Sequence, residues 1–307
     1  MRKSKELSTK KTSLLKQIKD NQFSYWFALP YMTFFFIFTV LPVITSIILS
    51  FTDFNMLQTP SFVGLENYSR LFFNDNIFIK AVKNTLVLAV LIGPGGYLLS
   101  LIFAWFINEL TPKVRALVTL IFYAPSICGN GLLIWTTMFS SDEYGYMNSL
   151  LIRLGAIQEP ILWFQNPKYM LLLVVLISLW SSLGTGFLSF IAGFQGMDKS
   201  CYEAGAIDGI RNRFQELWFI TLPMMKTQMM FSAVMSITGA FNVGAVITAL
   251  CGYPSNNYEL HTIMNHLEDY GGMRYEMGYA SSIAVVLFAM MIGANGLIKR
   301  LIGKVGQ

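Results

Sequence analysis

Charged residues are scarce in this sequence. Only 13% of its 307 residues are Asp, Glu, Lys or Arg, whereas a soluble globular protein carries about 25%. Hydrophobic residues make up 54% and aromatic residues 15%, and the mean hydropathy is +0.52. This composition excludes a disordered chain and an ordinary soluble enzyme, and it predicts an all-α, polytopic membrane protein.

Cysteine, histidine and catalytic motifs are equally sparse. Cys128, Cys201 and Cys251 are too few and too scattered for a disulfide framework or a cysteine-based metal site. The two histidines, His261 and His266, lie five residues apart, which does not place them on one helical face, so we expect ordinary loop residues. The sequence has no HExxH, GxSxG or Walker motif. We therefore expect no catalytic residue, no metal, no cofactor and no ATP site of its own.

Long charge-free segments separate the few charges. Six of them, each between 22 and 32 residues long, contain no Asp, Glu, Lys or Arg. A membrane-spanning helix needs about 20 mostly apolar residues, and backbone amides in hydrocarbon must bond within the helix. We predict six transmembrane helices near residues 25–51, 84–108, 116–139, 169–192, 228–250 and 277–298.

The distribution of Lys and Arg predicts the orientation. With the N-terminus in the cytosol, 16 of the 22 basic residues fall in the inside segments and 6 in the outside ones. The net charge of +5 is thereby explained by the membrane, without a nucleic-acid partner. We predict both termini to be cytosolic. The expected divisions are a basic tail (1–22), a first helix (23–51), an external segment (52–80), a core of five helices (81–299) and a C-terminal tail (300–307).

No ionisable residue lies within the core of any predicted span. Ion-coupled carriers usually bury such residues as relays or coordination sites, although backbone carbonyls can also hold Na⁺. An ion-coupled carrier is therefore disfavoured but remains open. A membrane-embedded enzyme is disfavoured as well, because the spans hold no nucleophile or metal cluster. Gly93-Pro94-Gly95-Gly96 in the second span lacks a following Lys-Ser/Thr, and we expect a helix kink there.

The segment between spans four and five, residues 193–227, is unusually long for a helix connection. Asp198 can cap a short helix, and Gly209 suits a left-handed stop after it. Pro223 is tolerated in the first turn of the next span. Small residues on the short helix would let it lie deep in a groove of another protein. A plain interfacial loop is the alternative.

This segment carries a resemblance. Glu203-Ala-Gly-Ala-Ile-Asp-Gly209, followed by Ile220-Thr-Leu-Pro223, resembles the EAA motif of permease subunits in binding-protein-dependent ABC importers. Phe62-Val-Gly-Leu-Glu-Asn-Tyr68 and Gly278-Tyr-Ala-Ser-Ser282 are similar to the maltose and glycerol-phosphate branch of that family. The motif differs in having Gly205 where the family has its second alanine, and in an interval one residue longer before the Ile-x-Leu-Pro group.

The resemblance implies the type I ABC importer permease fold and a role in a bacterial plasma (inner) membrane. It implies that the chain forms half of the translocation path for a sugar or oligosaccharide, or alternatively for a glycerol phosphate. The implied partners are a second related permease, two copies of an ATPase and an external solute-binding protein. It assigns ATPase coupling to Glu203, Ala204, Gly209, Leu222 and Pro223.

Polar and aromatic residues recur at one depth of spans three to five. They are Asn130, Trp180, Ser181, Thr238, Phe241 and Asn242. An amide can both donate to and accept from sugar hydroxyls, and an aromatic face suits the apolar side of a pyranose. Interhelical hydrogen bonding or simple packing is the alternative for each residue. Because no Lys or Arg lies at this depth, we expect a neutral substrate.

Overall fold

The computed structural model describes residues 22–129 and 131–303, and this part of the chain is helical without a β-strand. Elements of the first half are α2 (Gln22–Phe35), η1 (Phe36–Val40), α3 (Leu41–Leu49), α4 (Glu66–Ser69), η2 (Arg70–Asn74), α5 (Asn76–Asn108), α6 (Pro112–Ile127), α7 (Leu132–Met138) and α8 (Tyr146–Arg153). Elements of the second half are α9 (Pro167–Ser181), α10 (Thr185–Gln195), α11 (Lys199–Ile207), α12 (Arg213–Glu216), η3 (Leu217–Thr221), α13 (Leu222–Met224), α14 (Lys226–Phe241), α15 (Gly244–Cys251), η4 (Asn256–Tyr258), α16 (Ile263–Glu268), η5 (Asp269–Met273) and α17 (Met277–Gly303).

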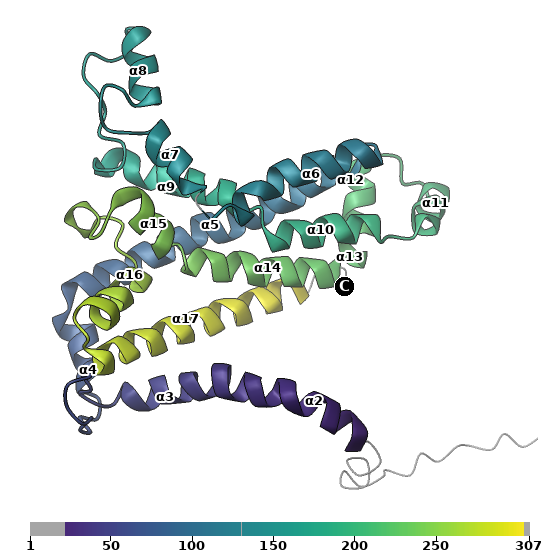
Figure 1. Cartoon of the computed structure of the whole chain (residues 1–307). Helices are drawn as coiled ribbons and strands as arrows, with labels where there is room; N and C mark the ends of the chain where they lie inside the picture. The colour runs from purple at the N-terminus through teal and green to yellow at the C-terminus, as the bar shows by residue number, and fades with distance from the viewer. Residues whose placement is uncertain (1–21, 130, 304–307) are drawn as a thin grey trace, which may run out of the picture.

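The long helices run side by side between two ends. Figure 1 shows α11 and α13 at one end, and α4, α8 and α16 at the other. We call them the α11 end and the α4 end. Three continuous helical segments are long and apolar enough to cross a membrane: Gln22–Leu49, Asn76–Asn108 and Met277–Gly303. Three bent pairs, α6 with α7, α9 with α10 and α14 with α15, bring the number of candidate spans to six.

The predicted spans are confirmed as helices, with two kinds of difference. The second begins at Asn76 rather than near residue 84, because Asp75 caps it by accepting a hydrogen bond of 2.8 Å from the Phe78 N–H. The third, fourth and fifth are each divided where continuous helices were predicted: the third into α6 and α7, and the fourth and fifth by bends of 43° and 44°. In the fourth span the Gly184 N–H bonds the Ser182 carbonyl at 2.8 Å, which closes a tight turn and ends α9.

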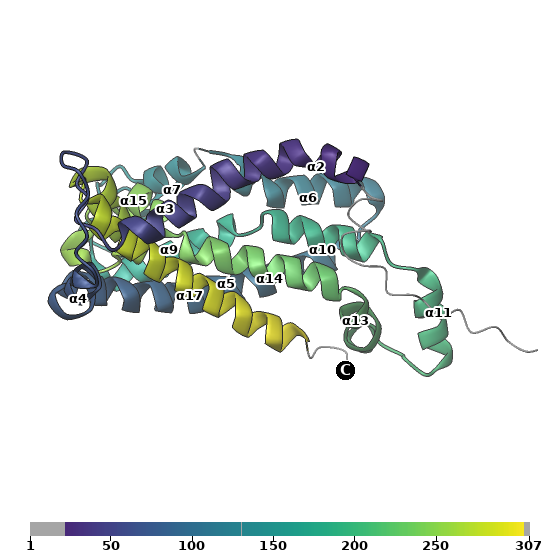
Figure 2. The same ribbon diagram turned by 90° about the horizontal axis from the view of Figure 1, so that it is seen from below.

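The core lies where α5, α10 and α14 pack together, as seen from below in Figure 2. The helix α5 continues through Pro94. The two glycines that follow Pro94 allow close approach of the fourth span: a Cβ on Gly95 would lie 2.9 Å from Leu179 Cδ2, and one on Gly96 would lie 2.7 Å from Ser182 Oγ. In contrast, α2 buries no residue. The first span contacts the rest of the molecule where α3 packs against α17.

Candidate functional site

A groove opens where the broken fourth and fifth spans face each other. It has a volume of about 270 Å³ and lies between the α9–α10 break, the α14–α15 break and Ile92 of α5. Its lining residues are Ile92, Ser178, Ser181, Ser182, Gly184, Thr185, Gly186, Met235, Ser236, Gly239, Ala240, Asn242, Val243 and Val246. Each break exposes polar groups at mid-span, so the breaks create the polar part of this groove.

Hydroxyl and amide groups dominate the polar lining. Five Ser or Thr side chains and Asn242 contribute to it, and the lining includes no Asp, Glu, Lys, Arg or His. The Ser178 side chain is 6% exposed, and its hydroxyl has no hydrogen-bond partner within the described chain. An unpaired buried hydroxyl costs free energy unless a ligand or water bonds it. The groove is therefore suited to a neutral, hydroxyl-bearing molecule.

Two of the six predicted path residues line the groove, within the described part of the chain. Ser181 and Asn242 line the groove. Trp180 is half-buried and packs edge-on against Trp135 at 5.3 Å between ring centroids; the Trp135 Nε1 donor has no partner within the described residues. Thr238 lies outside the lining and donates its hydroxyl to the Val234 carbonyl at 2.9 Å.

The last two predicted path residues are Phe241 and Asn130. Phe241 is 3% exposed and belongs to a core cluster with Ile237, Tyr279 and Ile283. It packs between spans instead of facing the groove. Asn130 lies outside the described residues.

The segment 193–227 forms a short helix with defined ends. The Asp198 side chain accepts a hydrogen bond of 3.0 Å from the Ser200 N–H at the start of α11. At the other end Gly209 has φ +94°, the Gly209 N–H bonds the Ala206 carbonyl at 3.4 Å, and the Ile210 N–H bonds the Gly205 carbonyl at 2.9 Å. This is the Schellman arrangement. The predicted cap and left-handed stop are confirmed.

The outer face of α11 is open, and its inner face is packed. Glu203 and Ala204 are exposed, and the apolar side chain of Ile207 is 87% exposed. On the inner face Gly205 is buried, and a Cβ there would lie 2.5 Å from Ile220 Cδ1. The bulk of Ile220 thus occupies the space that an alanine methyl at position 205 would need.

The helix α11 is connected to the base of the fifth span. The hydroxyls of Tyr202 and Thr221 lie 2.9 Å apart, within hydrogen-bond distance. Leu222 is buried, and Pro223 lies in the three-residue helix α13, which ends at Met224, before the fifth span begins at Lys226. The prediction that Pro223 lies in the first turn of that span was therefore wrong. An ion pair of 3.1 Å between Arg213 and Glu109 adds a contact to the end of α5. The 193–227 segment thus contacts η3, before the fifth span, through Tyr202 of α11, and the end of α5 through Arg213 of α12.

The two histidines were predicted to be ordinary loop residues, but both are buried and hydrogen-bonded. His261 is 1% exposed and His266 is 2% exposed, with His261 Nε2 lying 3.2 Å from His266 Nδ1. His266 Nε2 lies 3.0 Å from Asp75, which also accepts the Tyr279 hydroxyl at 2.8 Å. The network joins α16, the start of α5 and the start of α17. The helical-face criterion missed it because Asp75 and Tyr279 are distant in sequence.

Burial and hydrogen bonding perturb this network. Burial alone would raise the pKa of Asp75, but hydrogen bonds from His266, the Phe78 N–H and Tyr279 lower it well below its usual range. Burial, assisted by the charge of His266, lowers the pKa of His261 to about 4. Asp75 is thus ionised and His261 neutral at physiological pH. No group of three or more potential metal ligands is found within the described residues.

Curated relatives align over nearly the whole chain. A probable ABC transporter permease protein, YesP of Bacillus subtilis, is 33% identical over 282 residues, covering 89% of this chain and 88% of YesP. The arabinooligosaccharides transport system permease protein AraP of the same species is 30% identical over 286 residues, covering 91% and 88% of the two chains. The lactose transport system permease protein LacF of Rhizobium radiobacter is 30% identical over 244 residues, covering 77% and 78%. No family model matches the chain.

Solved structures agree with this alignment. A chain of a bacterial ABC transporter involved in the import of the acidic polysaccharide alginate superimposes with a TM-score of 0.73 at 26% identity, covering 94% of this chain and 98% of that one. The alginate transporter in complex with an alginate pentasaccharide-bound periplasmic protein gives the same TM-score at 25% identity, covering 96% and 99%. With the helical fold, the broken spans and the α11 loop in place, this chain belongs to the permease family of ABC transporters.

Proposed function

We propose that this chain is the membrane-spanning subunit of an ATP-driven importer for a neutral sugar or oligosaccharide. It forms half of the translocation path and pairs with a second, related permease, two ATPase subunits and an external solute-binding protein. The α11 end faces the cytosol and docks on the ATPase. The names of AraP and LacF support a sugar substrate, and the periplasmic protein bound to one solved relative supports the external partner.

The observation that carries the proposal is the uncharged hydroxyl-lined groove at the two helix breaks. Ser178, with its unpaired hydroxyl, and Asn242 offer donors and acceptors to sugar hydroxyls. Apolar side chains complete the lining, as in small-molecule sites whose few polar groups fix orientation. The Trp180–Trp135 pair beside the break adds aromatic surface for a pyranose face.

The groove also favours a neutral substrate over an anionic one, such as a glycerol phosphate or a uronate oligosaccharide. A phosphate or carboxylate in a groove without a cation would lose its hydration and gain no opposite charge. A glycerol phosphate or a uronate oligosaccharide would therefore bind poorly at these residues. Substrate competition tests this directly: neutral oligosaccharides should inhibit uptake, and uronate oligosaccharides of the same length should not.

Uptake into vesicles holding the assembled complex tests the groove. Asn242→Leu and Trp180→Ala should each reduce initial uptake of the preferred sugar about tenfold, the scale expected when a buried polar or aromatic contact is lost. Thr238→Val is the matched control, because Thr238 is on the same helix but outside the lining. ATPase co-purification should stay unchanged in all three variants. Normal uptake by both Asn242→Leu and Trp180→Ala would place the path elsewhere.

A further inference from the structure

A short helical stretch at the α11 end runs across the direction of the spans. Figure 1 shows the stretch from α12 through η3 to α13 crossing the long helices, and Figure 2 shows α13 nearly end-on. We call this stretch, residues 213–224, the crossing helix. Transmembrane helices stand close to the bilayer normal, with an average tilt of about 20°. A helix that runs across them therefore lies near the plane of the membrane.

Contacts with α5 fix the level of the crossing helix. The rings of Phe214 and Trp105 pack edge-on with 5.3 Å between centroids, and Trp105 lies in the last turn of the second span, which ends at Asn108. Arg213 pairs with Glu109, the next residue after that end, at 3.1 Å. One helical turn is only about 5.4 Å long. The crossing helix therefore lies where the second span leaves the hydrocarbon.

The crossing helix has a packed face and an open aromatic face. On the packed face Leu217 is half-buried against a core cluster, and Thr221 is 3% exposed. On the open face Phe214, Trp218 and Phe219 are 73%, 67% and 66% exposed. Phe214 and Trp218 are four residues apart, so they are neighbours on the helix surface. Aromatic side chains gather at the boundary between membrane and water, where their rings lie at the level of the lipid head groups.

The aromatic face is continuous with the surface of a spanning helix. Phe106, in the last turn of α5, is 58% exposed, and its ring stacks on Trp105 at 5.4 Å between centroids. Two basic residues accompany this surface: Lys113 in the first turn of α6 and Arg211 just before α12 are exposed. Neither forms an ion pair within the described part of the chain. Basic side chains at a membrane surface are attracted to anionic lipid head groups.

We propose that the crossing helix is an anchor in the membrane surface. Its aromatic face inserts at the boundary between head groups and acyl chains, and Lys113 and Arg211 contact anionic head groups. The level of Phe214 favours lipid over a protein partner, because a face that the chain leaves open at the end of a span meets the bilayer. The inference needs only that α5 spans the membrane, so it is independent of the sugar and the ATPase proposed above.

The anchor has a consequence for α11. Figures 1 and 2 both show α11 farther from the spans than the crossing helix. The hydroxyl contact of 2.9 Å between Tyr202 of α11 and Thr221 of the crossing helix joins the two elements. The anchor therefore holds the base of α11 at the membrane surface and leaves the outer face of α11 in water.

Site-specific fluorescence on the assembled complex in nanodiscs tests the anchor. In a variant whose three native cysteines are serine, an environment-sensitive fluorophore is attached to Trp218→Cys. The nanodiscs contain lipids with a nitroxide either beside the head group or at the end of the acyl chain. The nitroxide beside the head group should quench the label several-fold, the one at the chain end less, and aqueous iodide least. Phe219→Cys provides a second reading on the same face and should give the same order.

Ile207→Cys is the matched control, because its side chain is 87% exposed at the same end of the molecule but lies on α11. Neither nitroxide should quench a label there. Nanodiscs without anionic lipid should weaken the head-group quenching at Trp218→Cys, because Lys113 and Arg211 lose their partners. Unchanged quenching would overturn the contacts with anionic head groups.

Two results would overturn the anchor itself. Labels at both Trp218→Cys and Phe219→Cys that only iodide quenches would place the aromatic face in water. Labels shielded from iodide and from both nitroxides would show that another protein covers it. Uptake by the same complexes is measured separately, so either result leaves the proposed importer standing.

Discussion

Gly205 lies against Ile220 on the inner face of α11. A Cβ on Gly205 would lie 2.5 Å from Ile220 Cδ1. Alanine favours a helix over glycine by about 1 kcal/mol, and overpacking costs about 1–3 kcal/mol. We therefore expect Gly205→Ala to destabilise the wild type and to stabilise an Ile220→Val background, where the clashing methyl is gone.

A double-mutant cycle on the purified complex measures this change of sign. The melting temperature of Gly205→Ala should lie below that of the wild type, and that of the double variant above that of Ile220→Val alone. Gly272→Ala serves as control, because nothing lies within 4 Å of a Cβ at that position. Additive effects would mean that Ile220 adjusts freely and does not explain the glycine.

His261 makes stability depend on pH. Burial lowers its folded pKa to about 4, whereas the unfolded value is about 6.5. The unfolded state therefore binds a proton that the folded state refuses, so the stabilising contribution is complete above about pH 6.5 and is lost as the pH falls toward 4. His261→Gln removes this titration, and its melting temperature should fall less steeply over that interval.

Differential scanning fluorimetry between pH 8 and pH 4.5 follows this effect. The variant should melt lower than the wild type at pH 8, because the bond to His266 is altered. The two curves should converge as the pH falls. Parallel curves would show that His261 does not titrate between the folded and unfolded states.

At the scale of elements, the end of α11 depends on one backbone conformation. Gly209 has φ +94° and open space where a Cβ would lie, so a substitution there is opposed by backbone strain alone. Forcing a β-branched residue into this region costs about 1–2 kcal/mol. Gly209→Val should therefore displace the end of α11 and abolish most transport, with the chain still inserted.

A matched control distinguishes coupling from general strain. Gly155 also has a left-handed backbone, with φ +70° and no neighbour within 4 Å, but it lies after α8 at the other end of the molecule. Gly155→Val should keep transport and ATPase co-purification. Transport that survives in Gly209→Val, or fails equally in Gly155→Val, would remove the coupling role from the α11 loop.

The spans could be predicted because each is a charge-free run of sufficient length. The breaks could not be predicted, because Ser182 and Gly184 are tolerated inside transmembrane helices. The turn at Ser182 is recognised only in the structure, where Gly95 and Gly96 let α5 approach the fourth span closely. Ser181 and Asn242 were found as polar residues at one depth, whereas Phe241 shares that depth and faces the core. The depth of a residue in the membrane can be counted along the sequence, but the direction in which it faces on a broken helix cannot be predicted that way.

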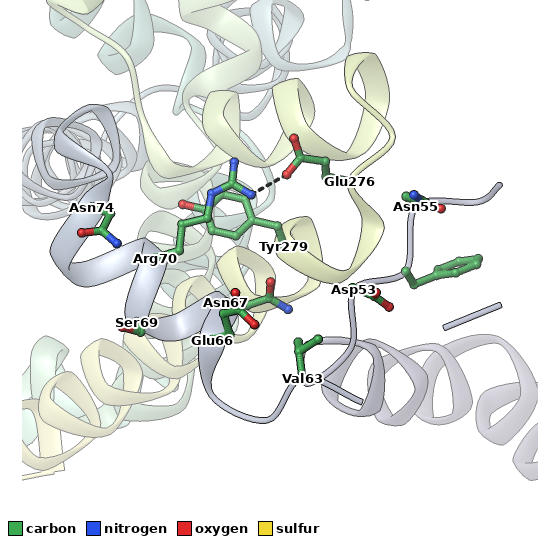
Figure 3. A pocket seen from close by; sticks show the side chains of 11 residues that line it. Asp53, Asn55, Val63, Glu66, Asn67, Ser69, Arg70, Asn74, Glu276 and Tyr279 are labelled. Carbon is green, nitrogen blue, oxygen red and sulfur yellow. Dashed lines mark hydrogen bonds and ion pairs between the residues drawn. The ribbon is translucent and has the colours of Figure 1, made fainter. Parts of the chain in front are cut away.

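The α11 loop and the α4 end show the same contrast. Asp198 and Gly209 act on the backbone within a few residues of their own position, so sequence reasoning located them. The Asp75–His266–Tyr279 network joins residues about 200 positions apart. A cleft at the α4 end (Figure 3) likewise unites residues 53–74 with the start of α17. Neither has a local pattern that a sequence could reveal.

At the scale of the whole molecule, α5 and α17 each extend from the α4 end toward the α11 end. The helix α5 runs from the Asp75 network at the α4 end to the Glu109–Arg213 ion pair at the α11 end. The helix α17 runs from Gly278, whose N–H bonds the Phe54 carbonyl, to Gly303, whose carbonyl accepts a 2.7 Å bond from Lys226. Under the proposed function, these two helices offer a mechanical route between the two faces of the membrane.

This arrangement works only if the α11 end is cytosolic, as the excess of Lys and Arg in its segments predicts. Ile207 on α11 and Tyr144 between α7 and α8 are 87% and 90% exposed, so cysteines placed there should react readily. In a variant whose three native cysteines are serine, a membrane-impermeant maleimide should label Tyr144→Cys in intact cells, and Ile207→Cys only after permeabilisation. Co-expression of the ATPase should then protect Ile207→Cys from labelling, because that side chain lies on the proposed docking face. Labelling of Ile207→Cys in intact cells would reverse the orientation, and with it the assignment of ATPase docking to α11.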